Sequence, residues 1–298
     1  MGLGQSLMFT LRGAFKGKLS ILGEHISPPR VIERLRSDLY LVSYPKTGRT
    51  WLRMLMKTAL HKHLGVPVKD PLEFHELTEK DERIPRISVV HDDEPHWKKT
   101  HELTSDKSKW YRNKKVILLI RDPRDTMVSL YIQMTKRWKV FTESEKTINE
   151  FIWQETGALK SMIEYYNIWA QNRDIPKDLL MIRYEDIHSQ TLQKLRESIE
   201  FLGVNDTPND TLNEAIEFNR LEKLKKREAS GEFNTKRLKP GSKDDPESMK
   251  VRKGKVGGYQ EYLSYDEACK IRDYTYEHLD PWYGYKALIE NELKRENN

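Results

Sequence analysis

The chain has 298 residues, of which 33% are charged and 37% hydrophobic. Leu, Ile, Val, Trp and Tyr recur in blocks, so we do not expect global disorder, and the single cysteine, Cys269, excludes an internal disulfide framework and a multi-cysteine metal site. A formal charge of +6 and a pI near 9.0 favour contact with an anion, which could be a phosphate ligand, nucleic acid or a membrane surface.

The first 35 residues are predicted to form a loosely packed N-terminal arm. They lack the compact apolar run and cleavage site of a secretory signal. Gly2 and Ser6 match the myristoylation pattern, and the apolar and basic residues that follow could form an amphipathic segment at a membrane surface. Because such short patterns match by chance, we favour the arm. No run in the chain approaches the roughly eighteen apolar residues of a membrane-spanning helix, so we expect no integral membrane insertion.

Three short apolar runs predict buried strands at residues 39–43, 116–120 and 179–183. Apolar residues at helical spacing follow each run. This alternation predicts an α/β fold with a single domain, residues 36–298, built on a central, mainly parallel sheet flanked by helices on both faces. Ligands are then expected at the carboxyl ends of the strands.

Local signals place the boundaries of several helices. Asp122 suits an N-cap and Pro123 the first helical position after the second strand, and Gly203 is expected to end the helix that follows the third. Residues 148–170 predict one long helix. Residues 223–255 are dense in Lys and Arg and show little periodicity, so we interpret them as a mobile flap.

Residues 44–51 (Tyr-Pro-Lys-Thr-Gly-Arg-Thr-Trp) join the first strand to its helix and have the features of a P-loop-like phosphate-binding turn. A glycine-containing turn there exposes backbone N–H groups at a helix N-terminus, where a phosphate gains hydrogen bonds and a favourable dipole. Lys46 adds a cation, and Thr47 and Thr50 add hydroxyl donors. The pattern is not the GxxxxGK[ST] of nucleotide triphosphatases. Alone, it could equally be a strand-to-helix turn with a solvated lysine.

This segment resembles the 5′-phosphosulfate loop of the cytosolic-type sulfotransferases, which use 3′-phosphoadenosine 5′-phosphosulfate (PAPS) and whose usual loop is YPKSGTTW. The resemblance implies that Trp51 stacks on the adenine. It also implies that the loop holds the 5′-phosphate through Lys46, Thr47, Gly48, Arg49 and Thr50. Arg49 departs from the Thr or Ser common in the family, so that hydroxyl contact is lost.

Two later segments resemble the parts of the family that bind the 3′-phosphate. Residues 121–125 (Arg-Asp-Pro-Arg-Asp) follow the second strand, and the resemblance assigns the 3′-phosphate to Arg121 and Ser129. Residues 252–259 resemble the family's RKGxxGDW segment. That match implies that three residues close over the same phosphate: Arg252, Lys253 and Gly254. Alone, the first segment could be a capped helix start and the second a solvated basic loop. Their order along the chain favours the resemblance.

Weaker matches complete the expected nucleotide site. Tyr184, in a family-like Tyr-Glu-Asp after the third strand, is implied to meet the adenine. Leu221 stands where the family often has Phe, which removes some ring stacking. The resemblance spans about residues 36–286 and implies PAPS as co-substrate and adenosine 3′,5′-bisphosphate (PAP) as product. No dimer element like that of the animal relatives is visible near the C-terminus, so the sequence predicts no oligomeric state.

The resemblance also implies how the sulfuryl group is transferred. Lys99-Thr100-His101 resembles the family's KTH element, in which His101 is the catalytic base and Lys99 steadies the transition state. An imidazole titrates near neutrality and can therefore accept the acceptor's proton. Lys46 would steady the bridging oxygen. No metal is expected, because the transferred group carries less charge than a phosphoryl group and lysines can do the work of Mg²⁺.

The acceptor is expected to be a small molecule with a hydroxyl or amine. Asp92, Asp93 and Glu94 precede the predicted catalytic segment and suggest a cationic acceptor, although a solvated acidic turn explains them at least as well. Two other functions stay open at this point. One is an ATP-dependent small-molecule kinase, and the other is a non-catalytic basic protein that binds nucleic acid or anionic membrane. The order of the motifs favours a sulfotransferase that binds no nucleic acid, and the lone cysteine fits a cytoplasmic location.

Overall fold

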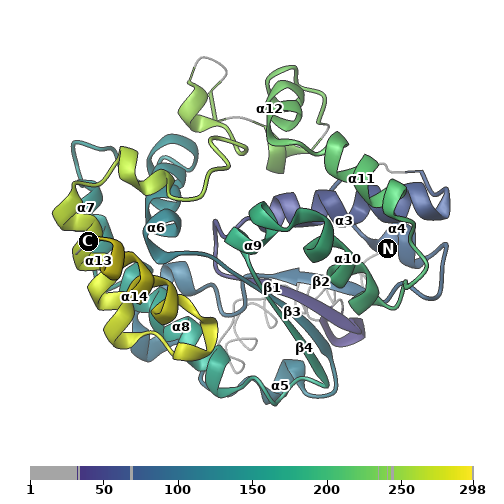
Figure 1. Cartoon of the computed structure of the whole chain (residues 1–298), viewed down its shortest axis with the longest axis horizontal. Coiled ribbons are helices and arrows are strands. Elements are labelled where there is room, and N and C mark those ends of the chain that lie inside the picture. The colour runs from purple at the N-terminus through teal and green to yellow at the C-terminus, as the bar shows by residue number, and fades with distance from the viewer. Residues whose placement is uncertain are drawn as a thin grey trace, which may run out of the picture.

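Four parallel strands form the central sheet of the computed structural model, in the order β2-β1-β3-β4 (Figure 1). They are β1 (Leu39–Ser43), β2 (Ile87–Val90), β3 (Lys115–Ile120) and β4 (Asp178–Arg183). Three of them confirm the predicted strands and the parallel sheet. The sequence did not reveal β2, because this short edge strand has only one fully buried residue, Ser88.

The structure describes residues 34–67, 70–233, 235–239, 241–242 and 245–296, together with Ile32. The predicted N-terminal arm therefore lies outside the described residues apart from Ile32, Arg34 and Leu35. In the described part of the chain, no helix is both long and apolar enough to cross a membrane.

The helices form two groups on opposite faces of the sheet (Figure 1). The α-helices are α3 (Arg49–Leu64), α4 (His75–Thr78), α5 (Ser108–Tyr111), α6 (Pro123–Ile132), α7 (Ile148–Trp153), α8 (Leu159–Gln171), α9 (Tyr184–Ser189), α10 (Thr191–Leu202), α11 (Asn209–Phe218), α12 (Leu221–Ala229), α13 (Tyr265–His278) and α14 (Tyr285–Glu296). A π-helical turn, η4 (Gln133–Arg137), extends α6. Short 3₁₀ turns include η2 (Pro95–Trp97), η3 (Thr100–Glu102), η6 (Pro246–Ser248) and η7 (Gly258–Glu261).

Each strand of the sheet buries alternate residues on opposite faces, because successive side chains of a strand point to opposite sides. Tyr40 and Val42 of β1 join a core with residues of α6, α8 and α13. Leu39 and Leu41 of the same strand join a second core with residues of α3, α10 and α11. Burial on both faces explains why the sequence of the central strands reads as continuous apolar runs.

The predicted helix boundaries are confirmed where a capping residue marks them. The Asp122 carboxylate accepts a hydrogen bond from the backbone N–H of Arg124 at 2.8 Å, and Pro123 is the first residue of α6. Gly203 ends α10 in the left-handed conformation, with φ of 107°. The first two segments predicted to bind phosphate therefore each lie at the carboxyl end of a strand and the start of a helix, after β1 and β3.

The single helix predicted for residues 148–170 is wrong, because the segment forms two helices, α7 and α8, separated by a turn at Gly157. Gly157 has φ of 63°, and a Cβ there would lie 1.9 Å from the backbone oxygen of His96. Its N–H also donates to the Lys98 carbonyl at 2.8 Å. The backbone of His96 lies so close to Gly157 that the helix must break there. The spacing of apolar residues does not reveal this contact, because it joins residues that are far apart in the sequence.

Part of the predicted flap, residues 223–255, is ordinary folded structure. It begins within helix α12, whose Leu224 packs with Met54, Phe233 and Leu238 in a small separate apolar cluster. The mobility expected of this segment stays a prediction.

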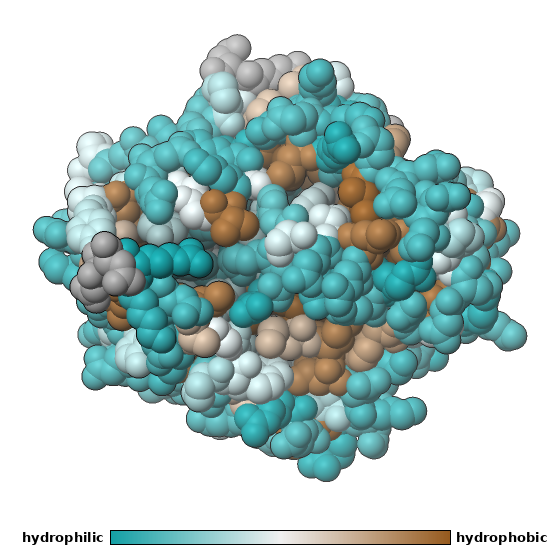
Figure 2. Space-filling view, viewed as in Figure 1, coloured by the Kyte–Doolittle hydropathy of each residue, from teal (hydrophilic) through white to brown (hydrophobic). Residues whose placement is uncertain are grey.

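Figure 2 shows the molecule from the same side as Figure 1. This face is mainly hydrophilic, with hydrophobic residues gathered in patches around its centre.

Candidate active site

The turn after β1 has the backbone geometry of a phosphate-binding loop. Lys46 and Gly48 both have positive φ, 72° and 92°, and α3 begins at the next residue, Arg49. A Cβ on Gly48 would lie 2.2 Å from the Tyr184 ring, so only glycine fits. Thr47 is buried, and its hydroxyl donates to the Tyr44 carbonyl at 2.9 Å. The Thr47 side chain therefore stabilises the turn from within.

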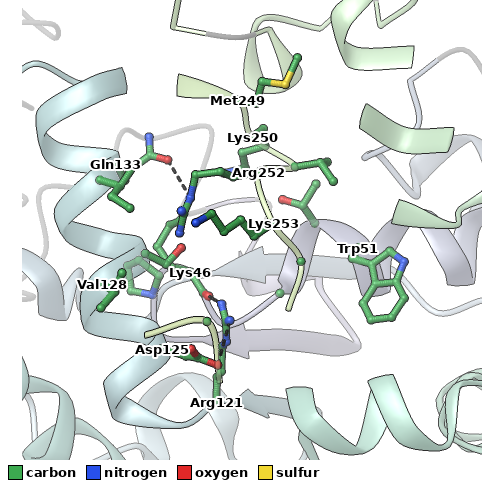
Figure 3. Close-up of a pocket in the computed structure, with 18 of the residues that line it drawn as sticks. Lys46, Trp51, Arg121, Asp125, Val128, Gln133, Met249, Lys250, Arg252 and Lys253 are labelled. Atoms are coloured by element: carbon green, nitrogen blue, oxygen red, sulfur yellow. Dashed lines mark hydrogen bonds and ion pairs between the residues drawn. The ribbon is translucent and has the colours of Figure 1, made fainter. Parts of the chain in front are cut away.

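The predicted nucleotide-binding residues line one pocket of about 1160 Å³, part of which is open to solvent. The lining includes Lys46, Gly48, Arg49, Thr50, Trp51, Arg121, Ser129, Tyr184, Leu221, Arg252, Lys253 and Gly254. In Figure 3 the side chains of Lys46, Arg252 and Lys253 converge in the middle of this pocket, although they come from opposite ends of the chain. Of the predicted residues that bind the nucleotide, only Thr47 is missing from the lining.

Arg121 links the three predicted segments at the base of the pocket. Its guanidinium donates to the Lys46 carbonyl at 3.2 Å and to the Lys255 carbonyl at 3.0 Å. It also stacks over the Tyr184 ring, with 4.3 Å between the guanidinium carbon and the ring centroid. Because these contacts use only part of its five donors, Arg121 can hold the pocket together and still bind an anion.

The late segment folds over the pocket through a close contact at Gly254. Gly254 has φ of 56°, and a Cβ there would lie 2.5 Å from the Leu221 side chain. Arg252 donates to Glu247 at 2.9 Å, and Lys253 pairs with Glu261. Both cations are thus held beside the pocket by carboxylates.

An aromatic group forms one end of the pocket. Trp51 lies beside the Tyr184 ring at 6.1 Å and beside His188 at 4.8 Å between ring centroids. Its indole N–H donates to the Asn219 carbonyl at 3.0 Å, which fixes the ring. The position suits the stacking of a flat base.

Several cationic side chains lie close together in the pocket. Burial lowers the pKa of Lys46 well below its ordinary value, and the positive charges of Lys250, Arg137 and other pocket cations lower it further. The Lys46 ammonium donates to Gln133 at 2.9 Å, as the dashed line in Figure 3 marks. A bound phosphate would relieve this repulsion, so the cluster favours a multiply charged ligand.

The structure does not bring the predicted catalytic pair to the pocket. Lys99 ion-pairs with Glu155 at 2.9 Å, and His101 is exposed on the 3₁₀ turn η3. Neither lies among the pocket-lining residues of the described chain. Their catalytic roles stay predictions, and a different histidine lines the pocket.

That histidine is His91, which follows the last residue of β2 and lines the pocket. Its Nδ1 lies 3.0 Å from the Ser43 carbonyl and its Nε2 lies 2.8 Å from the Arg49 guanidinium. The sequence carried one usable signal: Val89 and Val90 end a short extended run immediately before it. Had β2 been recognised, the rule that sites lie at the carboxyl ends of parallel strands would have pointed here.

Aromatic rings continue from His91 toward solvent. Between ring centroids, His96 lies 5.6 Å from His91, and Trp138 lies 5.7 Å from His96. Trp97 stacks on Trp138 at 5.9 Å, and both indoles are about half exposed, at 49% and 46%. Two exposed, stacked tryptophans beside a buried imidazole form an apolar platform at the edge of the pocket.

Two of the acidic residues that suggested a cationic acceptor, Asp92 and Asp93, form ion pairs and hydrogen bonds within the protein. Asp92 pairs with Lys107 at 2.8 Å and accepts from the Tyr111 hydroxyl at 2.5 Å. Asp93 pairs with Lys98 and accepts from the backbone of Thr104. Both carboxylates are buried, so they offer no free charge to an acceptor.

Asp92, Asp93 and Glu94 share a second unusual feature. All three have positive φ, at 35°, 67° and 49°. Consecutive non-glycine residues in this conformation are strained and persist only where surrounding contacts hold them. The buried ion pairs of Asp92 and Asp93 supply those contacts directly after His91. Neither this run nor any other group of three or more His, Cys, Asp or Glu in the described residues is arranged to hold a metal ion.

Comparison with known proteins identifies the family. A sequence profile described as the sulfotransferase domain matches residues 36–282. The chain is 26% identical over 255 residues to Cytosolic sulfotransferase 16 of Arabidopsis thaliana, a match that covers 79% of this chain and 74% of that protein. It is 27% identical over 244 residues to 3-alpha-hydroxysteroid sulfotransferase of Cavia porcellus, covering 78% of this chain and 79% of the relative.

A solved structure supports the fold. The chain superposes on mouse sulfotransferase SULT7A1, crystallised with PAP, with a TM-score of 0.57 and 18% identity, covering 85% of this chain and 89% of that one. The matched residues include all three phosphate-suited segments. Neither the kinase nor the non-catalytic basic protein is favoured. The chain therefore belongs to the sulfotransferase domain family, as the resemblance of its three segments to that family predicted, and is an enzyme of that family.

Proposed function

We propose that the pocket binds PAPS and that the protein transfers its sulfuryl group to a hydroxyl or amine of a small acceptor. The observation that carries this proposal is the gathering of three cationic segments and one half-buried imidazole around a single pocket. Two anionic ends of one nucleotide match two groups of cations within it. The reaction gives PAP and a sulfated product.

The 5′-phosphosulfate would lie on the turn after β1. The backbone N–H groups at the start of α3 and the Lys46 ammonium face this position, and a helix N-terminus favours negative charge. Lys46 would stabilise the bridging oxygen as charge develops on the leaving phosphate. The 3′-phosphate would lie against Arg121, Ser129, Arg252, Lys253 and Gly254, with the adenine stacked on Trp51 and in contact with Tyr184.

His91 is our candidate for the catalytic base. A carbonyl can only accept, so the contact to Ser43 requires the proton on Nδ1 and leaves the Nε2 lone pair toward the pocket. His101 lacks such a setting. In the transfer step Nε2 would take the acceptor proton while the acceptor oxygen or nitrogen forms its bond to sulfur. The bond between sulfur and the bridging oxygen then breaks, and its electron pair stays with PAP.

The acceptor would approach over the platform of Trp97 and Trp138. A flat apolar ring could pack on these indoles with its hydroxyl directed at His91. The proposal is supported by relatives named for compact polycyclic acceptors, the steroid sulfotransferase of Cavia porcellus and the Flavonol 3-sulfotransferase of Flaveria bidentis. Because Asp92 and Asp93 are paired internally, we do not include positive charge among the acceptor's required features.

Two further assignments belong to the proposal. Residues 36–298 act as one catalytic domain, and the part of residues 223–255 that carries Arg252 and Lys253 closes over the nucleotide. The protein works in the cytoplasm, in line with relatives named cytosolic sulfotransferases.

The direct test is nucleotide binding followed by transfer. Calorimetry with PAP should give a saturable signal, and PAP should raise the melting temperature because it binds only the folded state. Radiolabelled PAPS with a panel of phenols, sterols and amines should then give labelled product. The proposal would be abandoned if PAP produced neither heat nor thermal protection.

A further inference from the structure

The hydrogen bond between Arg49 and His91 occupies the atom that the proposed base needs. Arg49 Nη2 lies 2.8 Å from His91 Nε2. Because a guanidinium can only donate, Nε2 accepts this bond, in agreement with the tautomer that Ser43 imposes. The nucleotide-free protein therefore holds the right tautomer but has its lone pair covered.

Arg49 also has an unused donor beside the pocket. Its other terminal nitrogen, Nη1, is buried and has no hydrogen-bond partner in the described part of the chain. Burial lowers the pKa of Arg49 to about 9, which still leaves it protonated at neutral pH. A protonated fork with one unsatisfied donor is suited to two oxygens of a phosphate or sulfonate. Arg49 begins α3, at the place where that anion is expected.

We propose that Arg49 couples nucleotide binding to the release of the base: when the 5′-phosphosulfate enters, Arg49 turns from His91 to the donor's oxygens and uncovers Nε2. This inference rests on the proposed function of the pocket. The exchange is favourable because a guanidinium can bind two oxygens of a phosphate or sulfonate with both terminal nitrogens and pairs there with an opposite charge, whereas the imidazole offers one neutral acceptor. The acceptor then finds a free base only when the sulfuryl donor is in place.

The surroundings of His91 make this exchange matter. The groups that act on it are Arg49 from α3, His96 from η2 and Lys250 from the segment after η6. Burial lowers the pKa of His91 well below its ordinary value, and Arg49, His96 and Lys250 lower it further. Burial and Arg49 also lower the pKa of His96 to about 4, so His96 is neutral at pH 7. Arg49 and Lys250 are thus the two cations that lower the pKa of His91, and of these two only Arg49 also donates a hydrogen bond to it.

The test compares the titration of His91 in the full chain with and without PAP, followed by NMR of the histidine rings and assigned with a His91→Asn variant. Arg49→Thr restores the hydroxyl usual in the family and removes the covering group. In the free protein, His91 should titrate at higher pH in Arg49→Thr than in the wild type. Adding PAP should raise the pH at which His91 titrates in the wild type. The difference between the wild type and Arg49→Thr should then largely disappear. Arg49→Lys, which keeps the charge, should stay close to the wild type in the free state.

Lys250→Met is the matched control, because it removes a neighbouring cation that makes no hydrogen bond to His91. It should shift the titration of His91 by a similar amount with and without PAP. Identical titration in wild type and Arg49→Thr would overturn the inference, as would a gap that PAP leaves unchanged or a Lys250→Met variant that behaves like Arg49→Thr. Failure of the proposed function looks different: PAP would not bind to any of these proteins.

Discussion

Asp125 lies 3.2 Å from Arg121 and, with the same carboxylate, accepts the backbone N–H groups of Gly257 and Tyr259, both at 2.9 Å. A residue from the second of the segments proposed to bind phosphate thus anchors the third, although some 130 residues separate them in sequence. The carboxylate is buried and does not need to touch the nucleotide to matter for its binding. It sets where the late segment crosses the pocket.

Replacing Asp125 with Ala should therefore weaken PAP binding. Two buried N–H groups lose their acceptor, and each such loss costs about 1–3 kcal/mol when no water replaces it. We expect at least a tenfold rise in the dissociation constant, about 1.4 kcal/mol, measured by calorimetry. Asp210→Ala, which removes an exposed carboxylate from the first turn of α11, is the control and should leave the affinity unchanged. Equal affinities in both variants would show that the anchor is dispensable.

Histidine substitutions should separate the structural and sequence-based candidates for the base. His91→Asn should lower kcat by about 10²–10⁴-fold, the usual contribution of a general base, with PAP affinity changed little. His101→Asn should retain near wild-type turnover, since His101 is exposed outside the pocket lining. The opposite ranking of the two variants would return the role to His101 and require a large rearrangement of η3.

The glycine of the late segment offers a test with a built-in rescue. Gly254→Ala should weaken PAP binding, because the new methyl group would lie 2.5 Å from Leu221 and the backbone would keep an unfavourable positive φ. Adding Leu221→Ala removes the contacting atoms and should recover part of the affinity, leaving about 1 kcal/mol from the backbone. A double variant no better than the single one would mean that the Leu221 contact does not set the loop.

The stability of the turn after His91 should depend on Asp92. Asp92→Asn leaves Lys107 buried without its counter-charge, a change that typically costs about 3–5 kcal/mol in the free energy of unfolding. Urea denaturation would measure it. In the double variant Asp92→Asn, Lys107→Met no buried charge is left unpaired between these two positions, and the loss should be smaller. Additive losses would argue against the pairing.

The same carboxylate predicts how stability changes in acid. Burial alone would raise the pKa of Asp92, but Lys107, Tyr111 and Arg34 outweigh it, so the folded-state pKa lies below 3.8. The ion pair therefore contributes fully above pH 3.8 and its contribution is lost as the pH falls through the folded-state pKa. Asp92→Asn should show a shallower fall in unfolding free energy below pH 3.8 than the wild type. Equal slopes of unfolding free energy against pH in the two proteins below pH 3.8 would contradict this.

The sequence indicated most of the residues that line the pocket but not the imidazole among them, for a physical reason. Gly48, Arg121 and Gly254 lie within contiguous segments whose residue types suit a phosphate, so short motifs indicate them. His91 depends on a parallel edge strand with little apolar pattern. Its partner Arg49 was visible only as a departure from the family loop.

Charge patterns and helical periodicity were ambiguous in the remaining places. The run Asp92 to Glu94 is compatible with a solvated turn, an acceptor site or buried ion pairs, and only the positions of Lys107 and Lys98 decide among them. Residues 148–170 keep helical spacing of apolar side chains across Gly157, because both helices face the same core. A tertiary contact, not local propensity, separates them.

That contact at Gly157 has a consequence for anyone who alters the acceptor specificity of this protein. Position 157 lies far along the chain from η2, and a first survey of the pocket would leave it out. Yet any larger residue there must displace the backbone of His96 and, through His96, the platform of Trp97 and Trp138. Mutational libraries that aim at new substrates should hold this glycine constant, or vary it as a deliberate way to reshape the entrance.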